Sequence, residues 1–396
     1  MQAIILAAGK STRCYPLSIT RPKPLLPVAN RPILFYHLDN CVGLAKEIIL
    51  IIGYKGEMIK QLVGSSYNGI PVKYVNQKQA KGTAHALLQA APLISSKFLV
   101  MNGDDIYARD DIHALASHEN AVLVANREDP ENFGVVEHKG EILIRISEKP
   151  KQPKTKLVNA AAYCFQKEFL SALEQTEPSE RGELELTSAV NLYAETTNIH
   201  MHEVADYWYP LPYAWNLLDA NEGILESMEA AEDGIIEEGV TIKGKLIIGK
   251  GSVIKAGTYI EGNVLIGENT SVGPNCHIRG STTIGSNCKL GRVDIKNSIF
   301  MDRVYTKNFI FVGDSILGEG TNFGAGTLTA NWRHDNSGVK SIVNGVLINS
   351  GRRKLGTIVG DWVHTGINTS IYPGRKLWPK VWTLPGEVVK QDIMHQ

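Results

Sequence analysis

The chain has 396 residues, several times the usual size of one domain, so length alone predicts at least two domains. Its 41 Lys+Arg residues match its 41 Asp+Glu residues, and no basic run or acidic tail breaks this balance. Such a surface argues against a general nucleic-acid or membrane-surface binder. Hydrophobic residues at 43% and charged residues at 21% are ordinary for a globular protein with a buried core.

The longest apolar runs, such as Ile48–Ile52, are far too short to span a bilayer. The apolar start, Met1–Ala8, has no basic region before it and is followed at once by Gly9-Lys10, unlike a signal peptide. Five cysteines, an odd number without a C-x-x-C pair, fit reduced thiols better than a disulfide framework or a zinc site. These features exclude the membrane, secreted and disordered classes and predict a cytoplasmic protein.

Up to about residue 230, short apolar runs alternate with helical patterns, which predicts a doubly wound, Rossmann-like α/β domain over residues 1–230. Continuous rather than alternating hydrophobicity is typical of strands in a parallel sheet that is covered on both faces. In such a sheet, ligands bind at the carboxyl ends of the strands. The predicted strands are Ala3–Ala7, Ile48–Ile52, Phe98–Met101 and Ala121–Ala125, and the clearest helices are Pro32–Cys41 and Gly82–Ala91.

From Gly234 onward, glycine, asparagine and β-branched residues dominate, and an aliphatic residue recurs at every sixth position. A hexapeptide repeat is the signature of a parallel β-helix, whose coils stack each inward aliphatic side chain above the last. Ordinary β-sandwich strands would instead show period two with turns every 8 to 12 residues. We therefore predict an all-β parallel β-helix over residues 231–396. Its first frame is Ile236, Ile242, Ile248, Ile254, Ile260, Ile266, Val272, Ile278, Ile284 and Leu290.

After a reset, Ile299, Tyr305, Phe311, Leu317 and Phe323 continue the six-residue step. The repeat breaks off between Thr327 and Leu355 and resumes around Ile358 to Leu377, with Val359, Ile371 and Leu377 in step. An excursion from a regular solenoid marks either a tolerated loop or a binding loop. A short helix is predicted over Glu222–Glu232, joining the two halves.

The first motif with chemistry is Leu6-Ala7-Ala8-Gly9 through Arg13, a strand that runs straight into a glycine-containing turn. Backbone N–H groups in such a turn cradle phosphate, and Arg13 adds a charge-assisted clamp. A P-loop is excluded because that motif needs glycine where Ile4 stands. Further on, Pro22 and Pro24 flank Lys23 in a rigid extended segment. Taken singly, each element also fits a basic surface loop.

The second motif is Gly103-Asp104, directly after the apolar strand Phe98–Met101. A carboxylate at a strand's carboxyl end, near a phosphate turn, is placed as a Mg²⁺ ligand would be. Bound Mg²⁺ neutralises phosphate charge during an in-line displacement. A solvated Asp-Asp turn is the alternative.

Two further strand-to-loop junctions carry polar groups suited to a nucleotide and a sugar. Gln77 offers both a donor and an acceptor to a pyrimidine edge, and Gly82 permits close approach. Glu148 is suited to sugar hydroxyls, Lys149 to a phosphate and Asn159 to an acetamido group. Each of these, considered alone, is more often a surface group than a ligand.

Together these residues resemble a known family. Residues 1–221 are similar to the sugar-1-phosphate nucleotidylyltransferases, and the whole chain resembles the archaeal-type bifunctional nucleotidylyltransferase/acetyltransferases. It also resembles, less closely, the bacterial N-acetylglucosamine-1-phosphate uridylyltransferase/glucosamine-1-phosphate acetyltransferase. The matching motifs are Leu6-Ala7-Ala8-Gly9, Thr12-Arg13, Pro22-Lys23, Gly103-Asp104, Asn132-Phe133-Gly134, Glu148-Lys149-Pro150, Arg181-Gly182-Glu183 and Trp215-Asn216-Leu217-Leu218.

The resemblance implies that a sugar 1-phosphate attacks the α-phosphorus of a nucleoside triphosphate, giving an NDP-sugar and pyrophosphate. It assigns charge stabilisation to Arg13 and Lys23 and Mg²⁺ binding to Asp104. The Gly82-Thr83-x-His85-Ala86 run is closer to the uridylyltransferase pattern, so UTP and N-acetylglucosamine 1-phosphate are favoured over dTTP and glucose 1-phosphate. The implied nucleotide-binding residues are Leu6, Ala8, Gly9, Gln77, Gly82 and Thr83, and the implied sugar-phosphate residues are Gly134, Glu148, Lys149 and Asn159.

For the second domain, the resemblance implies a left-handed β-helix that forms a homotrimer and binds acetyl-CoA between neighbouring coils. The implied acetyltransferase positions are Lys296, Asn308, Asn322, Ala325 and Asn331.

Three positions depart from the family pattern. Ser11 stands where the phosphate turn usually has glycine. Pro210 replaces the second Mg²⁺-binding carboxylate, with Asp206 nearby in sequence. Asn308 stands at the position of the acetyltransferase's histidine base, and Phe311 at that of its tyrosine. Because an amide has no basic site near neutral pH, Asn308 cannot take a proton as imidazole does. His334 and His364 are the candidate replacements.

Two other readings stay open. A thymidylyltransferase that acts on glucose 1-phosphate differs only in base and sugar. A non-catalytic, nucleotide-sugar-binding regulatory protein is a different class, favoured by Pro210 and Asn308 and opposed by Arg13, Lys23 and Asp104.

Overall fold

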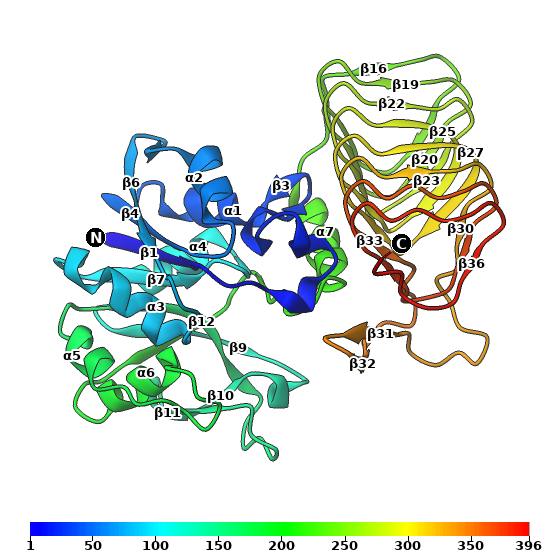
Figure 1. The fold of residues 1–396 in the computed structure, drawn as a ribbon. Coiled ribbons are helices and arrows are strands. Elements are labelled where there is room, and N and C mark those ends of the chain that lie inside the picture. Colours follow the sequence, from blue (N-terminus) through cyan, green and yellow to red (C-terminus); the bar gives the residue numbers. More distant parts are fainter. Residues whose placement is uncertain (396) are drawn as a thin grey trace. The chain divides into compact units, whose positions relative to one another are not determined.

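The computed structural model describes residues 1–395 and divides the chain into two compact units (Figure 1). The first, here called the sheet unit, comprises Met1–Lys10 and Ile33–Pro210. The second, the coil unit, comprises Ser11–Pro32 and the chain from Leu211 onward. A segment near the start of the chain therefore packs as part of the coil unit.

The sheet unit is built on a ten-stranded sheet in the order β10-β11-β13-β9-β12-β7-β1-β4-β6-β5. At its centre β7, β1, β4 and β6 are parallel neighbours, as their continuous apolar sequences predict. The bounds are β1 Gln2–Ala7, β4 Glu47–Ile52, β5 Ser66–Tyr67, β6 Ile70–Asn76, β7 Phe98–Asn102, β9 Ala121–Asn126, β10 Gly134–Lys139, β11 Ile142–Glu148, β12 Leu157–Phe165 and β13 His200–Glu203. All four predicted strands are confirmed.

The sheet is mixed, which corrects the expectation of a wholly parallel one. Strand β12 runs antiparallel to both β7 and β9, and β10 also pairs with β12 through Val135 and Val158. Strands β10, β11, β13, β9 and β12 therefore close into a ring at one side of the sheet. An apolar run does not reveal strand direction, because the antiparallel strand β12 is as buried as the parallel strands at the centre of the sheet.

Helices cover the sheet. Helices α3, α5 and α6 share one apolar core with Ile4, Ile49 and Val100 of the central strands, and α1 and α4 pack against each other. The bounds are α1 Ile33–Cys41, α2 Gly56–Val63, α3 Thr83–Ala90, α4 Arg109–Ser117, α5 Phe169–Glu174 and α6 Leu186–Ala194, with the short pair β8 Ile106–Tyr107 and β14 Trp208–Tyr209. The predicted helices at Pro32–Cys41 and Gly82–Ala91 are confirmed, each beginning one residue later.

In the coil unit, parallel strands stack in long ladders, which is consistent with the predicted β-helix. Ile236 pairs with Ile254, Ile254 with Val272 and Val272 with Leu290. These partners are three hexapeptides apart, so each coil uses three repeats. Except for Ile236 and Ile242, which are partly buried, the residues of the first frame are almost completely buried and share one apolar core.

The strands of the coil unit are short. They are β15 Ala231–Glu232, β16 Ile235–Ile236, β17 Thr241–Lys243, β18 Leu246–Ile248, β19 Val253–Ile254, β20 Tyr259–Glu261, β21 Val264–Ile266, β22 Ser271–Val272, β23 His277–Arg279, β24 Thr282–Ile284, β25 Lys289–Lys296, β26 Ile299–Phe300, β27 Tyr305–Gly313, β28 Ile316–Leu317, β29 Asn322–Phe323, β30 Leu328–Thr329, β31 Lys340–Val343, β32 Val346–Asn349, β33 Ile358–Val359, β34 Ser370–Ile371, β35 Lys376–Leu377 and β36 Val388–Val389.

The second predicted frame is wrong at its first three positions. Ile284 pairs with Phe300 and Leu290 with Thr306, so these coils are shorter than the earlier ones, and the register shifts between Gly291 and Val293. The inward positions are therefore Phe300, Thr306 and Val312, whereas Tyr305 is 40% exposed. Leu317 and Phe323 are in step and buried, as predicted.

The linking helix is also displaced. Helix α7 spans Asn216–Ser227, earlier than the predicted Glu222–Glu232, and Ala231–Glu232 already forms strand β15. The excursion predicted from Thr327 to Leu355 leaves the coil as the antiparallel hairpin β31–β32, which Figure 1 shows projecting from the stacked coils.

The N-terminal part of the coil unit, Ser11–Pro32, is made of tight turns. It contains the 3₁₀ helices η1 Thr12–Cys14, η2 Leu17–Ile19 and η3 Lys23–Leu25 and the strand pair β2 Pro27–Val28 and β3 Arg31–Pro32. Leu17, Leu26 and Val28 are fully buried. Among the described residues, no helix has the length and hydropathy that crossing a membrane requires.

Candidate active site

The carboxyl ends of the central parallel strands meet at one edge of the sheet. Strand register places Ala7 beside Ile52, Ile52 beside Asn76, and Leu6 beside Asn102. The residues that follow these strands are Ala8-Gly9, Gly53, Gln77 and Gly103-Asp104. The sequence-predicted phosphate turn, base-reading glutamine and metal-binding carboxylate therefore share this edge.

Backbone hydrogen bonds join the strand ends at this edge. Gly103 N donates to Leu6 O at 3.0 Å, and Tyr54 N donates to Ala8 O at 3.1 Å. A Cβ atom on Gly103 would lie 2.9 Å from Leu6 O, and one on Gly53 would lie 2.7 Å from Ala8 O. Glycine is needed at both places because the neighbouring backbone approaches so closely. Gly9 itself is exposed at the end of β1.

Gln77 follows β6 and is buried, with 8% of its surface exposed. Its Nε2 donates to Gly82 O at 3.1 Å and lies 3.0 Å from Nδ1 of His85. The amide is therefore held against the first turn of α3. That fixed orientation suits a group that reads the edge of a base.

Gly82 and Thr83, at the start of α3, are fastened to the segment before α6. Gly82 has φ +108°, and a Cβ atom there would lie 2.3 Å from Leu184 O. The Thr83 hydroxyl accepts a hydrogen bond from Leu186 N at 2.9 Å. Glycine is thus required at position 82 because the backbone of Leu184 approaches it closely. The sequence alone suggests a different reason for this glycine, the approach of a ligand.

Asp104 and Asp105 follow β7, above the buried His37 of α1. Asp105 Oδ2 accepts a hydrogen bond from Trp208 Nε1 at 3.3 Å, and Trp208 pairs with Tyr107 through strands β14 and β8. Pro210, which replaces a carboxylate of the family pattern, follows β14 directly. Asp206 is exposed, and its backbone N–H is held by Asp111 at 3.2 Å. Among residues 1–395, no group of three or more His, Cys, Asp or Glu side chains is placed to hold a metal ion.

The predicted sugar-phosphate residues Gly134, Glu148 and Asn159 lie together. Gly134 pairs with Glu148 in the β10–β11 ladder. A Cβ atom on Gly134 would lie 2.8 Å from Ile146 Cγ2, 3.3 Å from Glu148 Oε1 and 3.6 Å from Asn159 Cβ, so close packing favours glycine here. Glu148 is partly buried, with 30% of its side chain exposed. Partial burial raises the pKa of its carboxyl above the usual range, and the Glu185 carboxylate adds to that effect.

Lys149 follows Glu148 with φ +44°, a left-handed conformation that is strained for a lysine. Its backbone N–H donates to Phe133 O at 2.9 Å, which closes the end of the hairpin. Arg181 contributes a further charge, with its guanidinium 3.7 Å from Glu148 and 2.7 Å from Glu185.

Strand β12 is bulged at Asn159. Its pairing register with β9 shifts between Asn159 and Tyr163, and Ala161 has φ +58°. Asn159 Nδ2 donates to Tyr163 Oη at 2.6 Å, and Asn159 Oδ1 accepts from Ala161 N at 2.9 Å. Both side chains are buried, and burial raises the pKa of the Tyr163 hydroxyl. Bulges are common beside active sites because they redirect side chains, and this one holds Asn159 in a fixed position.

Arg13 and Lys23 belong to the coil unit. Arg13 is exposed, with its guanidinium carbon 5.8 Å from the centre of the Tyr213 ring. Lys23 is 2% exposed and opens η3. Ser11 has φ +50°, which explains why glycine is usual at this position of the phosphate turn.

Two of the predicted acetyltransferase positions, Lys296 and Asn331, contact Asp314 on the coils. Asp314 accepts hydrogen bonds from Asn331 Nδ2 at 2.6 Å and from Asn297 Nδ2 at 2.8 Å. Lys296 O accepts from Asp314 N at 2.8 Å. The sequence did not single out Asp314 as a candidate, although it stands in the Gly313-Asp314 pair that ends the relevant stretch.

The other acetyltransferase positions lie on neighbouring turns of the coils. Asn308 is exposed with φ +69°, its O accepts from Gly326 N at 3.0 Å, and the adjacent Phe309 is 71% exposed. Asn322 N donates to Val363 O and Ala325 O accepts from Asn368 N. Of the two histidines considered as replacements, His364 stacks between Asn322 and Trp382 in a ladder of bridges. His334 instead lines a cavity of about 370 Å³ with Trp332 and Tyr372.

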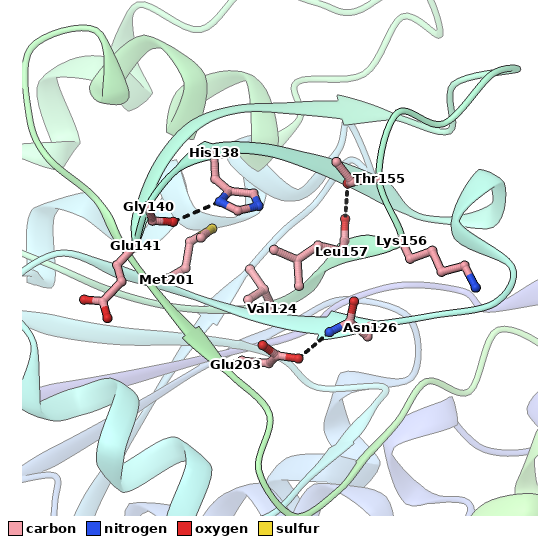
Figure 2. A pocket seen from close by; sticks show the side chains of 10 residues that line it. All are labelled: Val124, Asn126, His138, Gly140, Glu141, Thr155, Lys156, Leu157, Met201 and Glu203. Atoms are coloured by element: carbon pink, nitrogen blue, oxygen red, sulfur yellow. Dashed lines mark hydrogen bonds between the residues drawn. The ribbon is translucent and has the colours of Figure 1, made fainter.

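A separate cavity of about 510 Å³ lies at the ring of strands β9, β10, β12 and β13 (Figure 2). Val124, Leu157 and Met201 contribute apolar surface to it, while Asn126 and Glu203 are hydrogen-bonded to each other. None of the sequence-predicted site residues lines this cavity.

Comparisons with known proteins show the family to which the chain belongs. Residues 2–227 match the family model described as nucleotidyl transferase, and residues 260–375 match the one described as GMPPB C-terminal domain. The bifunctional protein GlmU of Methanocaldococcus jannaschii is 40% identical over 99% of this chain and 96% of its own length. The chain belongs to the bifunctional sugar-1-phosphate nucleotidylyltransferase/acetyltransferase family.

Two further proteins are similar to this chain. A bifunctional sugar-1-phosphate nucleotidylyltransferase/acetyltransferase of Sulfurisphaera tokodaii is 37% identical, over 99% of this chain and 98% of its own. A crystal structure of a putative glucose-1-phosphate thymidylyltransferase from Bacillus anthracis, in complex with sucrose, has TM-score 0.53 and 27% identity. It covers 59% of this chain and 98% of that chain. As a member of the nucleotidylyltransferase/acetyltransferase family, the chain is an enzyme with a nucleotidyl transferase domain.

In this nucleotidylyltransferase domain, we expect the buried His37 to make the free energy of unfolding depend on pH. Burial lowers its pKa from 6.5 to about 4, although the nearby Asp104 and Asp105 oppose that effect. A histidine with a lowered folded-state pKa is protonated first in the unfolded chain. We therefore expect the free energy of unfolding to fall as pH drops from 6.5 toward 4, by about 3 kcal/mol from this group.

Denaturant unfolding at several pH values measures this loss. The variant His37→Gln, which carries no titratable group at this position, should show a flatter profile between pH 6.5 and 4. Equal slopes for wild type and His37→Gln would contradict the assignment.

Proposed function

We propose that the chain transfers a nucleotidyl group from UTP or dTTP to a sugar 1-phosphate, most readily N-acetylglucosamine 1-phosphate. An oxygen of the sugar phosphate attacks the α-phosphorus, the bond to the β-phosphate oxygen breaks, and pyrophosphate leaves. The observation that carries this proposal is the single sheet edge on which the β1 turn, Gln77 and Asp104 follow neighbouring strands. Ligands of open α/β sheets bind at such an edge.

The base and the phosphates are assigned to the turns at that edge. Gln77 and the backbone at Gly82-Thr83 contact the base, with the amide already oriented by Gly82 and His85. The turn from Leu6 through Ala8 and Gly9 offers backbone N–H groups to the phosphates. Arg13 and Lys23 stabilise the negative charge that develops on the phosphates, which is the main lever in phosphoryl transfer.

The sugar 1-phosphate is assigned to the residues around Gly134. Glu148 accepts hydrogen bonds from sugar hydroxyls, and Asn159, held by Tyr163, meets the acetamido group. Lys149 pairs with the phosphate. Buried amides that hydrogen-bond a substrate discriminate strongly against analogues without the matching group, so Asn159 favours the N-acetylated sugar.

Mg²⁺ is the cofactor that this chemistry implies, and Asp104 is the residue that would hold it. Mg²⁺ commonly binds through one or two carboxylates plus substrate phosphates and water, so a single aspartate fits the ion despite Pro210. When bound, Mg²⁺ neutralises phosphate charge. The buried His37 beneath Asp104 stays neutral near pH 7, because its pKa is lowered to about 4, and so adds no competing positive charge.

We further propose that residues 231–396 form a left-handed β-helix domain that trimerises in the cytoplasm, following the nucleotidylyltransferase domain 1–230. Large apolar side chains stay exposed on its later coils, among them Phe309 at 71%, Trp382 at 53% and Trp362 at 44%. Exposed large apolar side chains are enriched at interfaces between subunits. Acetyl-CoA is the proposed substrate, beside Lys296, Asn308, Asn322, Ala325 and Asn331.

A thymidylyltransferase acting on glucose 1-phosphate is the second candidate. It is favoured by the structural likeness to a putative glucose-1-phosphate thymidylyltransferase. A non-catalytic regulatory protein that binds nucleotide-sugar is the rival of another class.

Pyrophosphate release in the presence of Mg²⁺ tests the transferase. UTP and dTTP are each combined with glucose 1-phosphate and N-acetylglucosamine 1-phosphate. We expect turnover, fastest with UTP and the N-acetylated sugar, and a loss of about 100-fold in Asp104→Ala because a ligand for phosphate-bound Mg²⁺ is removed. The exposed Asp110→Ala is the matched control. No turnover with any pair, from folded protein, would favour the regulatory reading.

Acetyl transfer from acetyl-CoA to glucosamine 1-phosphate tests the second domain. Because Asn308 cannot act as a base, we expect weak activity that rises about 100-fold in Asn308→His, which restores an imidazole. Asn308→Gln keeps the amide and is the control. If Asn308→His is no faster than Asn308→Gln, then this position does not supply the base.

A further inference from the structure

The segment Ser11–Pro32 is fastened to the coils by side chains that lie far along the sequence. At its start, Thr12 Oγ1 accepts from Asn344 Nδ2 of the β31–β32 turn at 3.0 Å. At its end, Asn30 Nδ2 donates to Ile284 O at 2.7 Å, and Ala29 N donates to the buried Asn221 Oδ1 at 2.9 Å. The strongest attachment lies between these two.

That central attachment is an ion-pair cluster around Arg21. Its Nη2 lies 2.6 Å from Asp361 Oδ2 and 2.6 Å from Glu319 Oε2. Asp361 is 3% exposed, and its Oδ2 also accepts from Thr20 Oγ1 at 2.7 Å, while its Oδ1 accepts from Glu319 N at 2.8 Å. A buried carboxylate must be paired, so the donors of this segment satisfy a charge that the coils bury.

Lys23 stands two residues after Arg21 on a rigid turn. Pro22 and Pro24 flank it, Leu25 N donates to Pro22 O at 2.9 Å, and Leu26 N donates to Lys23 O at 2.9 Å. Proline fixes φ on both sides and removes most of the freedom by which this turn could adjust. Displacing Arg21 therefore displaces Lys23, a buried residue with 2% of its surface exposed.

We propose that Arg21 is a positioning residue for nucleotidyl transfer: its ion pairs with Asp361 and Glu319 make the coils part of the support for Lys23. The inference rests on the proposed role of Lys23 in stabilising phosphate charge. It makes the coils a requirement for the first reaction, independent of any acetyl transfer. Because one nitrogen of Arg21 makes both ion pairs, a lysine ammonium group can replace it.

Steady-state kinetics of the full chain test the proposal. In Arg21→Gln we expect kcat for pyrophosphate release to fall about tenfold, since a charge-assisted anchor is lost. The KM for sugar 1-phosphate should stay unchanged, because Gly134, Glu148 and Asn159 do not depend on this anchor. Arg21→Lys should restore most of kcat. Arg303→Gln is the matched control, because Arg303 also pairs with Glu319 but belongs to the coils and not to the segment.

A second measurement does not depend on activity. Lysine acylation followed by peptide mass spectrometry should modify Lys23 slowly in the wild type and in Arg303→Gln, and about tenfold faster in Arg21→Gln, because the turn is released. Wild-type turnover with an unchanged kcat in Arg21→Gln, or equal labelling of Lys23 in both proteins, would overturn the positioning role. A wild type without turnover but with the expected labelling would overturn the proposed reaction and leave the anchor established.

Discussion

Parallel strands in this chain pair in register, so equivalent positions of distant segments lie side by side. In the sheet unit, that pairing aligns the carboxyl ends of β1, β4, β6 and β7. Each strand then delivers one polar turn to the same edge, and glycines at 53 and 103 let those turns approach to within backbone contact. The site at this edge follows from the register and from very few side chains.

In-register pairing of parallel strands also builds the coils. Partners three hexapeptides apart stack Ile236, Ile254, Val272 and Leu290 in one row, and the stacked aliphatic side chains form a continuous core. Such a solenoid is stiff because each coil is held by its neighbours. A stiff solenoid is a good support for the short, proline-rich turn around Lys23. Asp361 and Glu319 of the solenoid hold that turn through their ion pairs with Arg21.

Much of the fold and of the candidate site can be predicted from the sequence. Continuous apolar runs give the four central strands, and the polar residues after them give the edge. The hexapeptide period identifies the first frame. The second predicted frame is wrong where the coils shorten. The register shift between Gly291 and Val293 turns Tyr305 outward and Thr306 inward. Because threonine is not aliphatic, the search for an aliphatic repeat misses this inward position.

Other features depend on distant partners that no local pattern reveals. The bulge at Asn159 is set by pairing with β9 and by the Tyr163 hydroxyl. The need for glycine at 82 comes from Leu184, about a hundred residues away. Arg21 looks like part of a basic loop in sequence, yet its partners lie 298 and 340 residues later and make it a partly buried anchor.

The decisive measurement is a crystal structure of the protein with bound UDP-N-acetylglucosamine. We expect the uracil against Gln77 and Gly82, the diphosphate over the turn after β1 near Asp104, and the acetamido group against Asn159. A nucleotide-sugar bound away from the carboxyl ends of β1, β6 and β7, for example at the ring of strands around Val124 and Met201, would contradict it.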